Sequence, residues 1–101
     1  MQIKLDSSVE KFISDLDKQI VAKVLRTIDL LEKFGPSLRL PHSKPVTKGL
    51  FELRTRGQQE VRILYVFNKG GIVLVHGFIK KSIKIPQAEL NKGLAKLKNL
   101  T

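Results

Sequence analysis

Two arginines, Arg54 and Arg62, have the type and spacing that suit the binding of an anion. They lie in two predicted strands, residues 50–55 and 61–67, on either side of a turn whose tip is the three residues 57–59. If those three residues form the hairpin loop, Arg54 stands directly opposite Arg62 on one face of the sheet. Like charges in this position destabilise a sheet. An anion, most simply a phosphate, would supply the missing counter-charge.

A second hairpin would add a lysine and an empty space to the same face. A turn at residues 69–70 puts Gly77 beside Arg62 and places Lys81 in the same row. Because glycine has no side chain, the cations would border a concave site in the middle of the sheet. The pattern therefore predicts a basic site for a phosphate, built from Arg54, Arg62 and Lys81.

A plainer interpretation gives the two arginines ordinary partners. Glu52 and Glu60 flank them in the sequence, so each carboxylate can pair with an arginine on a solvated surface. Clusters of charge mark functional sites only in a statistical sense. The residues alone favour neither the phosphate site nor the ion-paired surface.

Other side chains that could take part in catalysis are expected to have structural roles. His76 falls on the predicted apolar face, where a histidine is usually a hydrogen-bonded core residue, and Tyr65 is expected in the core. His42 lies in a proline-rich loop from which it can swing toward the sheet. Two distant histidines in a chain without cysteine give little support to a metal site, and we expect no cofactor.

The first forty residues have the hydrophobic period of helices. Residues 3–5 alternate between apolar and polar, which is typical of a short edge strand. Ser7 or Ser8 is then expected to cap a helix, and a second helix should end at the Gly-Pro pair 35–36. With a break near residues 15–18, the two apolar stripes predict an antiparallel helical pair that packs on a core.

The hydrophobic period changes in the second half of the chain. Two prolines exclude a regular helix from residues 40–45, which are expected to form a loop. Strands are predicted at residues 50–55, 61–67 and 72–79, and their short turns require antiparallel pairing. Pro86 begins a final helix. The predicted fold is α+β, with an N-terminal helical hairpin packed on a small twisted antiparallel sheet, plus a C-terminal helix.

The charge of the chain is strongly positive and uneven. Nineteen Lys and Arg against nine Asp and Glu give a net charge of +10, and residues 41–101 hold twelve of the basic residues but three of the acidic ones. Such an excess attracts polyanions such as nucleic acid, although a soluble lysine-rich surface has the same composition.

Length and hydropathy limit the possible architectures. A chain of 101 residues predicts one domain, residues 1–101. It lacks an apolar run of the ~20 residues needed to span a bilayer, and its beginning lacks the pattern of a signal peptide. We therefore expect a cytoplasmic protein that has no membrane partner.

Five segments of the second half form an ordered pattern. They are Leu40–Pro45, Gly49–Arg54, Val61–Tyr65, His76–Ser82 and the helix that begins at Pro86. The most specific part is the succession Glu-Leu-Arg, Arg-Ile-Leu-Tyr and Gly-Phe-Xaa-Lys-Lys. With the helical pair before it, the chain resembles bacterial and phage toxins of the RelE/ParE superfamily, and in particular the HigB-like branch. The resemblance implies a helical hairpin on one face of the sheet and an active surface on the other.

The resemblance also implies a function. Such toxins are ribosome-dependent endoribonucleases that cut mRNA in the A site, and a cognate antitoxin holds them inactive. The antitoxin expected here is a helix-turn-helix protein with an acidic segment. The basic site residues of the family match Arg54, Arg62 and Lys81, which are thereby implied to be catalytic. We expect the RNA also to contact further basic residues, namely Lys44, Lys48, Arg56, Lys80 and Lys84.

Two other functions fit the same sequence. A ParE-like toxin would inhibit DNA gyrase by binding it, and a basic regulator would bind nucleic acid without any enzymatic activity. Charges that converge on a phosphate favour a nuclease over a gyrase inhibitor, but they do not separate cleavage from binding. The leading hypothesis is an mRNA interferase that arrests translation.

Overall fold

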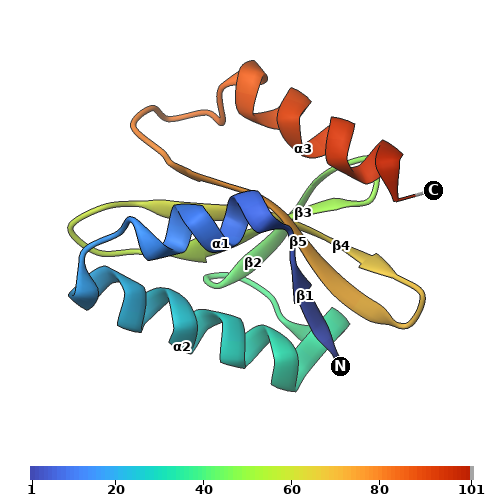
Figure 1. Cartoon of the computed structure of the whole chain (residues 1–101), viewed down its shortest axis with the longest axis horizontal. Coiled ribbons are helices and arrows are strands. Elements are labelled where there is room, and N and C mark those ends of the chain that lie inside the picture. Colours follow the sequence, from blue (N-terminus) through green and yellow to red (C-terminus); the bar gives the residue numbers. More distant parts are fainter. Residues whose placement is uncertain (101) are drawn as a thin grey trace.

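The core of the fold is a mixed sheet, which the computed structural model shows within residues 1–100, the part of the chain it describes. The strand order is β1-β5-β4-β3-β2; β1 runs parallel to β5, and the other neighbours are antiparallel (Figure 1). The strands are β1 (Ile3–Leu5), β2 (Ser43–Thr47), β3 (Leu50–Thr55), β4 (Val61–Asn68) and β5 (Gly71–Ile79). The short edge strand predicted at residues 3–5 is confirmed as β1.

Helices at both ends of the chain pack on this sheet, which confirms the α+β prediction. They are α1 (Ser7–Ser14), α2 (Lys18–Phe34) and α3 (Gln87–Asn99). The carboxylate of Asp6 caps α1 by accepting a hydrogen bond from the Ser8 backbone N–H at 3.0 Å, so the cap expected at a serine is wrong. The predicted end of α2 is confirmed at Gly35, whose φ of 51° suits glycine.

No α-helix of residues 1–100 is long and apolar enough to cross a membrane.

The segment expected to be a loop contains the edge strand β2. Ser43 pairs with Leu53, and Lys44 pairs with Glu52. Pro45 is tolerated here because β2 is an edge strand of the sheet. On the open side of an edge strand no neighbouring strand needs a hydrogen bond from the backbone N–H that proline lacks. The buried Ser43 hydroxyl also hydrogen-bonds the Tyr65 hydroxyl, which ties β2 to the core.

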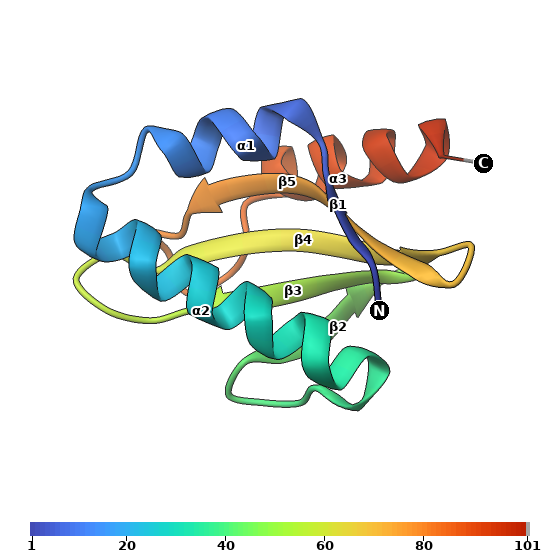
Figure 2. The ribbon, with the colours of Figure 1, turned by 60° about the horizontal axis from the view of Figure 1, so that its bottom comes forward.

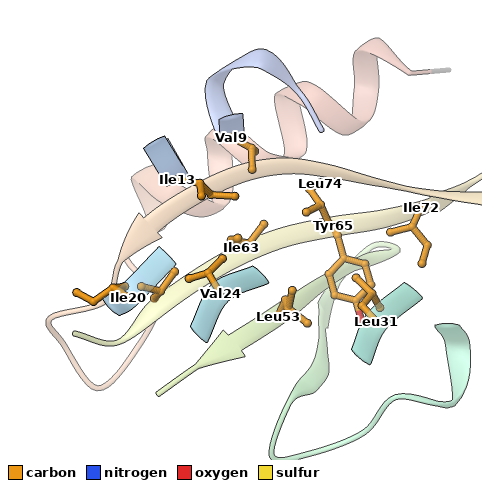
Figure 3. Close-up of a cluster of buried hydrophobic side chains, with 11 residues drawn as sticks. Val9, Ile13, Ile20, Val24, Leu31, Leu53, Ile63, Tyr65, Ile72 and Leu74 are labelled. Carbon is orange, nitrogen blue, oxygen red and sulfur yellow. The ribbon is translucent and has the colours of Figure 1, made fainter. Parts of the chain in front are cut away.

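Helices α1 and α2 cover one face of the sheet (Figure 2). Their apolar side chains pack with residues of β3, β4 and β5 in a cluster that includes Val9, Val24, Leu31, Ile63 and Tyr65 (Figure 3). Tyr65 is 1% exposed, which confirms its prediction as a core residue. Burial raises the pKa of its hydroxyl, while the bond to Ser43 opposes that shift.

Helix α3 covers part of the opposite face, so that face is not wholly open. Its leucine stripe packs with a second apolar cluster that contains Leu50, Leu64, Val66, Val75 and Phe78. Figure 1 shows α3 on one side of the sheet and α2 on the other. Beside α3, a hollow remains between β2, Glu52 of β3 and the loop that joins β5 to α3.

A β-bulge changes the predicted register of the second hairpin. The first hairpin is as predicted, with Arg54 opposite Arg62. The second begins as predicted, with Phe67 opposite Ile72, but the register shifts by one between Leu64 and Tyr65. Beyond the bulge Arg62 stands opposite Phe78, so the expected space beside Arg62 is not there.

The bulge turns each later residue of β5 to the opposite face. Gly77 lies against α1, where an added Cβ would collide with the Phe12 ring. His76 lies under α3 instead of on the predicted apolar face, and its Nε2 is 2.8 Å from Glu89 Oε1. The same shift brings Lys80, and not Lys81, into the row of the arginines.

Candidate nucleic-acid interface

The two arginines that face each other in β3 and β4 share a buried carboxylate. Oε1 of Glu52 lies 3.5 Å from Nε of Arg54, and its Oε2 lies 3.5 Å from Nε of Arg62. The side chains of Glu52 and Arg62 are 1% and 2% exposed, and that of Arg54 is 18% exposed. Glu52 therefore neutralises the repulsion that its two neighbours would otherwise exert.

Glu60 supplies a second counter-charge at the start of β4. Its Oε1 accepts a hydrogen bond from Nη2 of Arg62 at 3.0 Å and lies 3.4 Å from Nε of Arg56. The counter-charges thus come from the chain itself, as the ion-paired interpretation predicted. The solvated surface expected in that interpretation is wrong for Arg62, because its other terminal nitrogen bonds the Val61 carbonyl and almost none of the side chain is exposed.

The pKa of Glu60 is lowered by this arrangement. The hydrogen bond from Arg62 is the main cause, the Gly57 N–H and the charges of Arg62 and Arg56 add to it, and burial opposes it. A carboxyl whose pKa is lower in the folded state stabilises the fold above its ordinary pKa, and this contribution is lost as the pH falls through the lowered pKa.

We therefore expect the free energy of unfolding to be larger for wild type than for Glu60→Gln at neutral pH. This difference should disappear in acid. The effect is modest because the Glu60 side chain is one-third exposed. Urea denaturation of both proteins across the acid range measures it. Asp6, whose pKa is also lowered, mainly by the Ser8 hydroxyl, titrates alike in both proteins. A difference that did not change with pH would contradict the assignment.

The pairs around Glu52 are ionic contacts without good hydrogen-bond geometry. Both oxygens of Glu52 and the Nε atoms of Arg54 and Arg62 are buried and make no hydrogen bond within residues 1–100. The charge of Glu52 is therefore compensated by the two arginines alone, and removal of either arginine leaves this buried carboxylate with one cation.

A hollow of about 420 Å³ opens beside this buried group, between β2, α3 and the loop that follows β5. Three of its lining side chains are lysines, Lys44, Lys80 and Lys84. Its one acidic lining residue within the described chain is Glu52, which is already engaged by two arginines. The hollow consequently presents positive charge, in a volume that admits a phosphate with its sugar.

The loop from β5 to α3 carries two of these lysines and an apolar side chain that is exposed to solvent. Figure 1 shows it bowing away from the sheet. The Lys80 backbone N–H donates to the Glu60 carbonyl at 2.8 Å, so the start of the loop is fixed to β4. Ile83 lies between the lysines and is 95% exposed. Sequence inspection had no reason to select Ile83, because a single apolar residue in a loop carries no period.

The other predicted site residues lie elsewhere. Lys48 is in the turn between β2 and β3 with a φ of 46°, near the C-terminal half of α3. Arg56 is exposed, and it borders cavities between α2 and β3. Lys81 is exposed in the loop after β5 and does not line the hollow. The structure therefore gathers Lys44, Lys80 and Lys84, with Arg54 and Arg62 joined to them through Glu52.

Glu52 is the residue whose importance the sequence conceals. The sequence predicts that Glu52 relieves one of the two arginines as a neighbour in the sheet, and not that it contacts both. A signal was nevertheless present, because Glu52 sits inside a strand whose neighbours Phe51 and Leu53 are apolar. A carboxylate in that position is either solvated or held by buried cations, and the two arginines of the same predicted face were the available cations.

The comparison with known proteins adds a family assignment. The sequence profile of one family, described as phage derived protein Gp49-like (DUF891), matches residues 11–98. This match covers α2, all of the sheet except β1, and nearly all of α3. No curated protein matches the sequence.

Proposed function

The chain belongs to the Gp49-like family of the RelE/HigB-type toxin group, and from this premise we propose that it is a toxin that cuts mRNA on the ribosome. The family is phage-derived and toxin-like, which fits the toxin of a toxin–antitoxin pair. Cleavage of mRNA, and its dependence on the ribosome, are the parts of the proposal that go beyond the family.

The observation that carries the proposal is the lysine-lined hollow. Lys44, Lys80 and Lys84 come from β2 and from the loop after β5, and they converge on one space beside a buried, internally neutralised group of charges. Ammonium groups that converge on a phosphodiester hold it by charge and stabilise the additional negative charge of a phosphoryl transition state.

The arginines take different roles in this proposal. Arg54 is partly exposed, so its guanidinium can reach a phosphate at the edge of the hollow. Arg62 is buried, and it acts by holding Glu52 and Glu60 in place, as a positioning residue. Lys80 takes the place that the sequence assigned to Lys81, because the bulge shifts the row by one residue.

The chemistry expected at this site is attack of a ribose 2′-hydroxyl on the adjacent phosphate. The oxygen–phosphorus bond to the 2′ oxygen forms, the bond to the 5′ oxygen of the next nucleotide breaks, and a proton passes from the 2′ oxygen to the leaving oxygen. Within residues 1–100, no histidine lines the hollow. Lysine with its ordinary pKa of about 10 is a poor base at neutral pH, so alignment of the RNA by the ribosome would supply much of the acceleration.

An antitoxin with an acidic segment fits the same surface. The hollow offers three ammonium groups, and Ile83 offers an exposed apolar contact beside them. A segment that pairs carboxylates with the lysines would exclude RNA from the hollow. Electrostatic steering would make this association fast and dependent on salt.

Expression without an antitoxin is the experiment that tests the proposed function. We expect protein synthesis, followed by pulse labelling, to stop before DNA synthesis, and mapping of mRNA 5′ ends to show new cuts within coding regions. Arrest of DNA synthesis first, with intact mRNA, would establish the gyrase inhibitor instead. Binding of nucleic acid with neither arrest nor new 5′ ends would establish the non-enzymatic regulator.

A further inference from the structure

A second cationic cavity lies on the other side of the sheet edge. It has a volume of about 310 Å³ and opens between α2 and the end of β3. Four of its lining residues are basic, and no acidic residue of the described part of the chain lines it. They are Lys23, Arg26, Arg54 and Arg56, and of these the Arg54 guanidinium is held at Glu52, in the wall of the lysine-lined hollow. Lys23 and Arg26 make no ion pair with any part of residues 1–100.

The remaining walls of this cavity suit a planar ring. Leu30 and Pro41 present apolar surface, and His42 also lines the cavity. Thr27 and Thr55 also line it, and Thr55 Oγ1 donates a hydrogen bond to Thr27 Oγ1 at 3.1 Å. Imidazole and guanidinium planes stack on unpaired bases, while cations beside them hold the phosphate.

The cavity and the lysine-lined hollow adjoin along the chain. His42 borders the cavity and Lys44 borders the hollow. The two residues are separated by roughly 7 Å of extended backbone. Arg54 joins them further, because it lines the cavity while its Nε contacts Glu52 in the wall of the hollow. Consecutive nucleotides of one strand can therefore occupy the two spaces.

We propose that this cavity is a nucleotide subsite, which holds the base and phosphate of an RNA residue next to the one bound at the hollow. The base lies against Leu30, Pro41 and His42, and the phosphate is held by Lys23 and Arg26. As an extension of the proposed function, the subsite gives the free protein a measurable affinity for a single nucleotide.

Size and shape favour a nucleotide over an acidic peptide. A cavity near the lower end of the range for small-molecule sites takes one compact ligand, whereas an acidic helix or strand needs an extended groove. Two unpaired cations at the cavity match one phosphate, and the apolar walls would gain little from a carboxylate side chain.

The test is amide NMR of the whole isotope-labelled protein during titration with adenosine 5′-monophosphate, inorganic phosphate or a hexaglutamate peptide. We expect the nucleotide to shift amides of residues 23–30, 41–42 and 54–56, and to bind more tightly than phosphate. Arg26→Ala should weaken nucleotide binding about tenfold, as expected for loss of a charged hydrogen bond. Lys33→Ala is the matched control, since Lys33 is exposed on the same helix and lines none of these cavities.

Three results would overturn the proposal. These are equal weakening by Arg26→Ala and Lys33→Ala, nucleotide-induced shifts confined to the hollow, and tighter binding of hexaglutamate than of the nucleotide at the same amides. The last result would make the cavity a docking site for an acidic partner. Because the readout needs neither ribosome nor cleavage, a failure of the proposed mRNA cleavage would leave the result for this subsite unaffected.

Discussion

Replacement of Arg62 by alanine is expected to lower the free energy of unfolding by about 3–5 kcal/mol. The buried carboxylate of Glu52 would lose one of its two cations, and Glu60 would lose its closest hydrogen-bond donor. Domains of this size have a total stability of roughly 5–15 kcal/mol, so the variant would lose a large share of its stability. Urea denaturation followed by circular dichroism measures the loss.

A second substitution separates lost charge balance from lost packing. The pair Arg62→Met and Glu52→Gln removes the two fully buried charges and keeps most of the volume. Arg54 loses its carboxylate but is 18% exposed, so we expect the double variant to regain part of the stability that Arg62→Met alone loses. If the single and double variants were equally unstable, the charge pair would not be what stabilises this part of the sheet. If Arg62→Ala were as stable as wild type, the burial of Arg62 would have no energetic importance.

The largest expected effect on function comes from the three lysines of the hollow. We expect the triple variant Lys44→Ala, Lys80→Ala, Lys84→Ala to bind single-stranded RNA on the order of 100-fold more weakly than wild type. The slope of log affinity against log salt should fall by about 2, since each phosphate contact on a single strand contributes roughly 0.7. Fluorescence anisotropy with a labelled unstructured RNA, measured across salt concentrations, tests both values.

A charge-matched variant controls this experiment. Lys18→Ala, Lys33→Ala, Lys92→Ala removes the same net charge from exposed helical positions that do not line the hollow. Surface substitutions of this kind change stability by about 0.5 kcal/mol or less, so both variants should fold. Equal losses of affinity in the two triple variants would mean that RNA responds to net charge alone and that the hollow is not a site.

The first hairpin could be predicted from the sequence because its loop leaves little freedom. A hairpin loop of three residues, 57–59, joins the apolar alternation of β3 to that of β4, and this loop length places Arg54 opposite Arg62. The second hairpin could not be predicted to the same precision. Residues 72–75 are all apolar, so either set of alternate positions can face the core, and nothing in the sequence marks the shift at Leu64 and Tyr65. That single bulge determines whether Lys80 or Lys81 lies in the row of the arginines.

The packing of α3 on the second face of the sheet could be predicted only in part. The stripe of Leu90, Leu94 and Leu97 predicts an amphipathic helix but does not say which surface it covers. Strand β4 is apolar at nearly every position, including Leu64 and Val66 on the far face, and such a strand is expected to be buried on both sides. Strand β2 was not predicted because of Pro45. Proline argues against a central strand, but an edge strand such as β2 accepts it.

Cleavage of mRNA by the purified protein on programmed ribosomes is the most direct test of the central claim. Primer extension should reveal 5′ ends within the A-site codon when wild type or the Lys18, Lys33, Lys92 control variant is added. The Lys44, Lys80, Lys84 variant should produce none, and free mRNA should be cut poorly by any of them. Folded wild-type protein that leaves ribosome-bound mRNA intact would contradict the account, as would cleavage that the three substitutions in the hollow do not diminish.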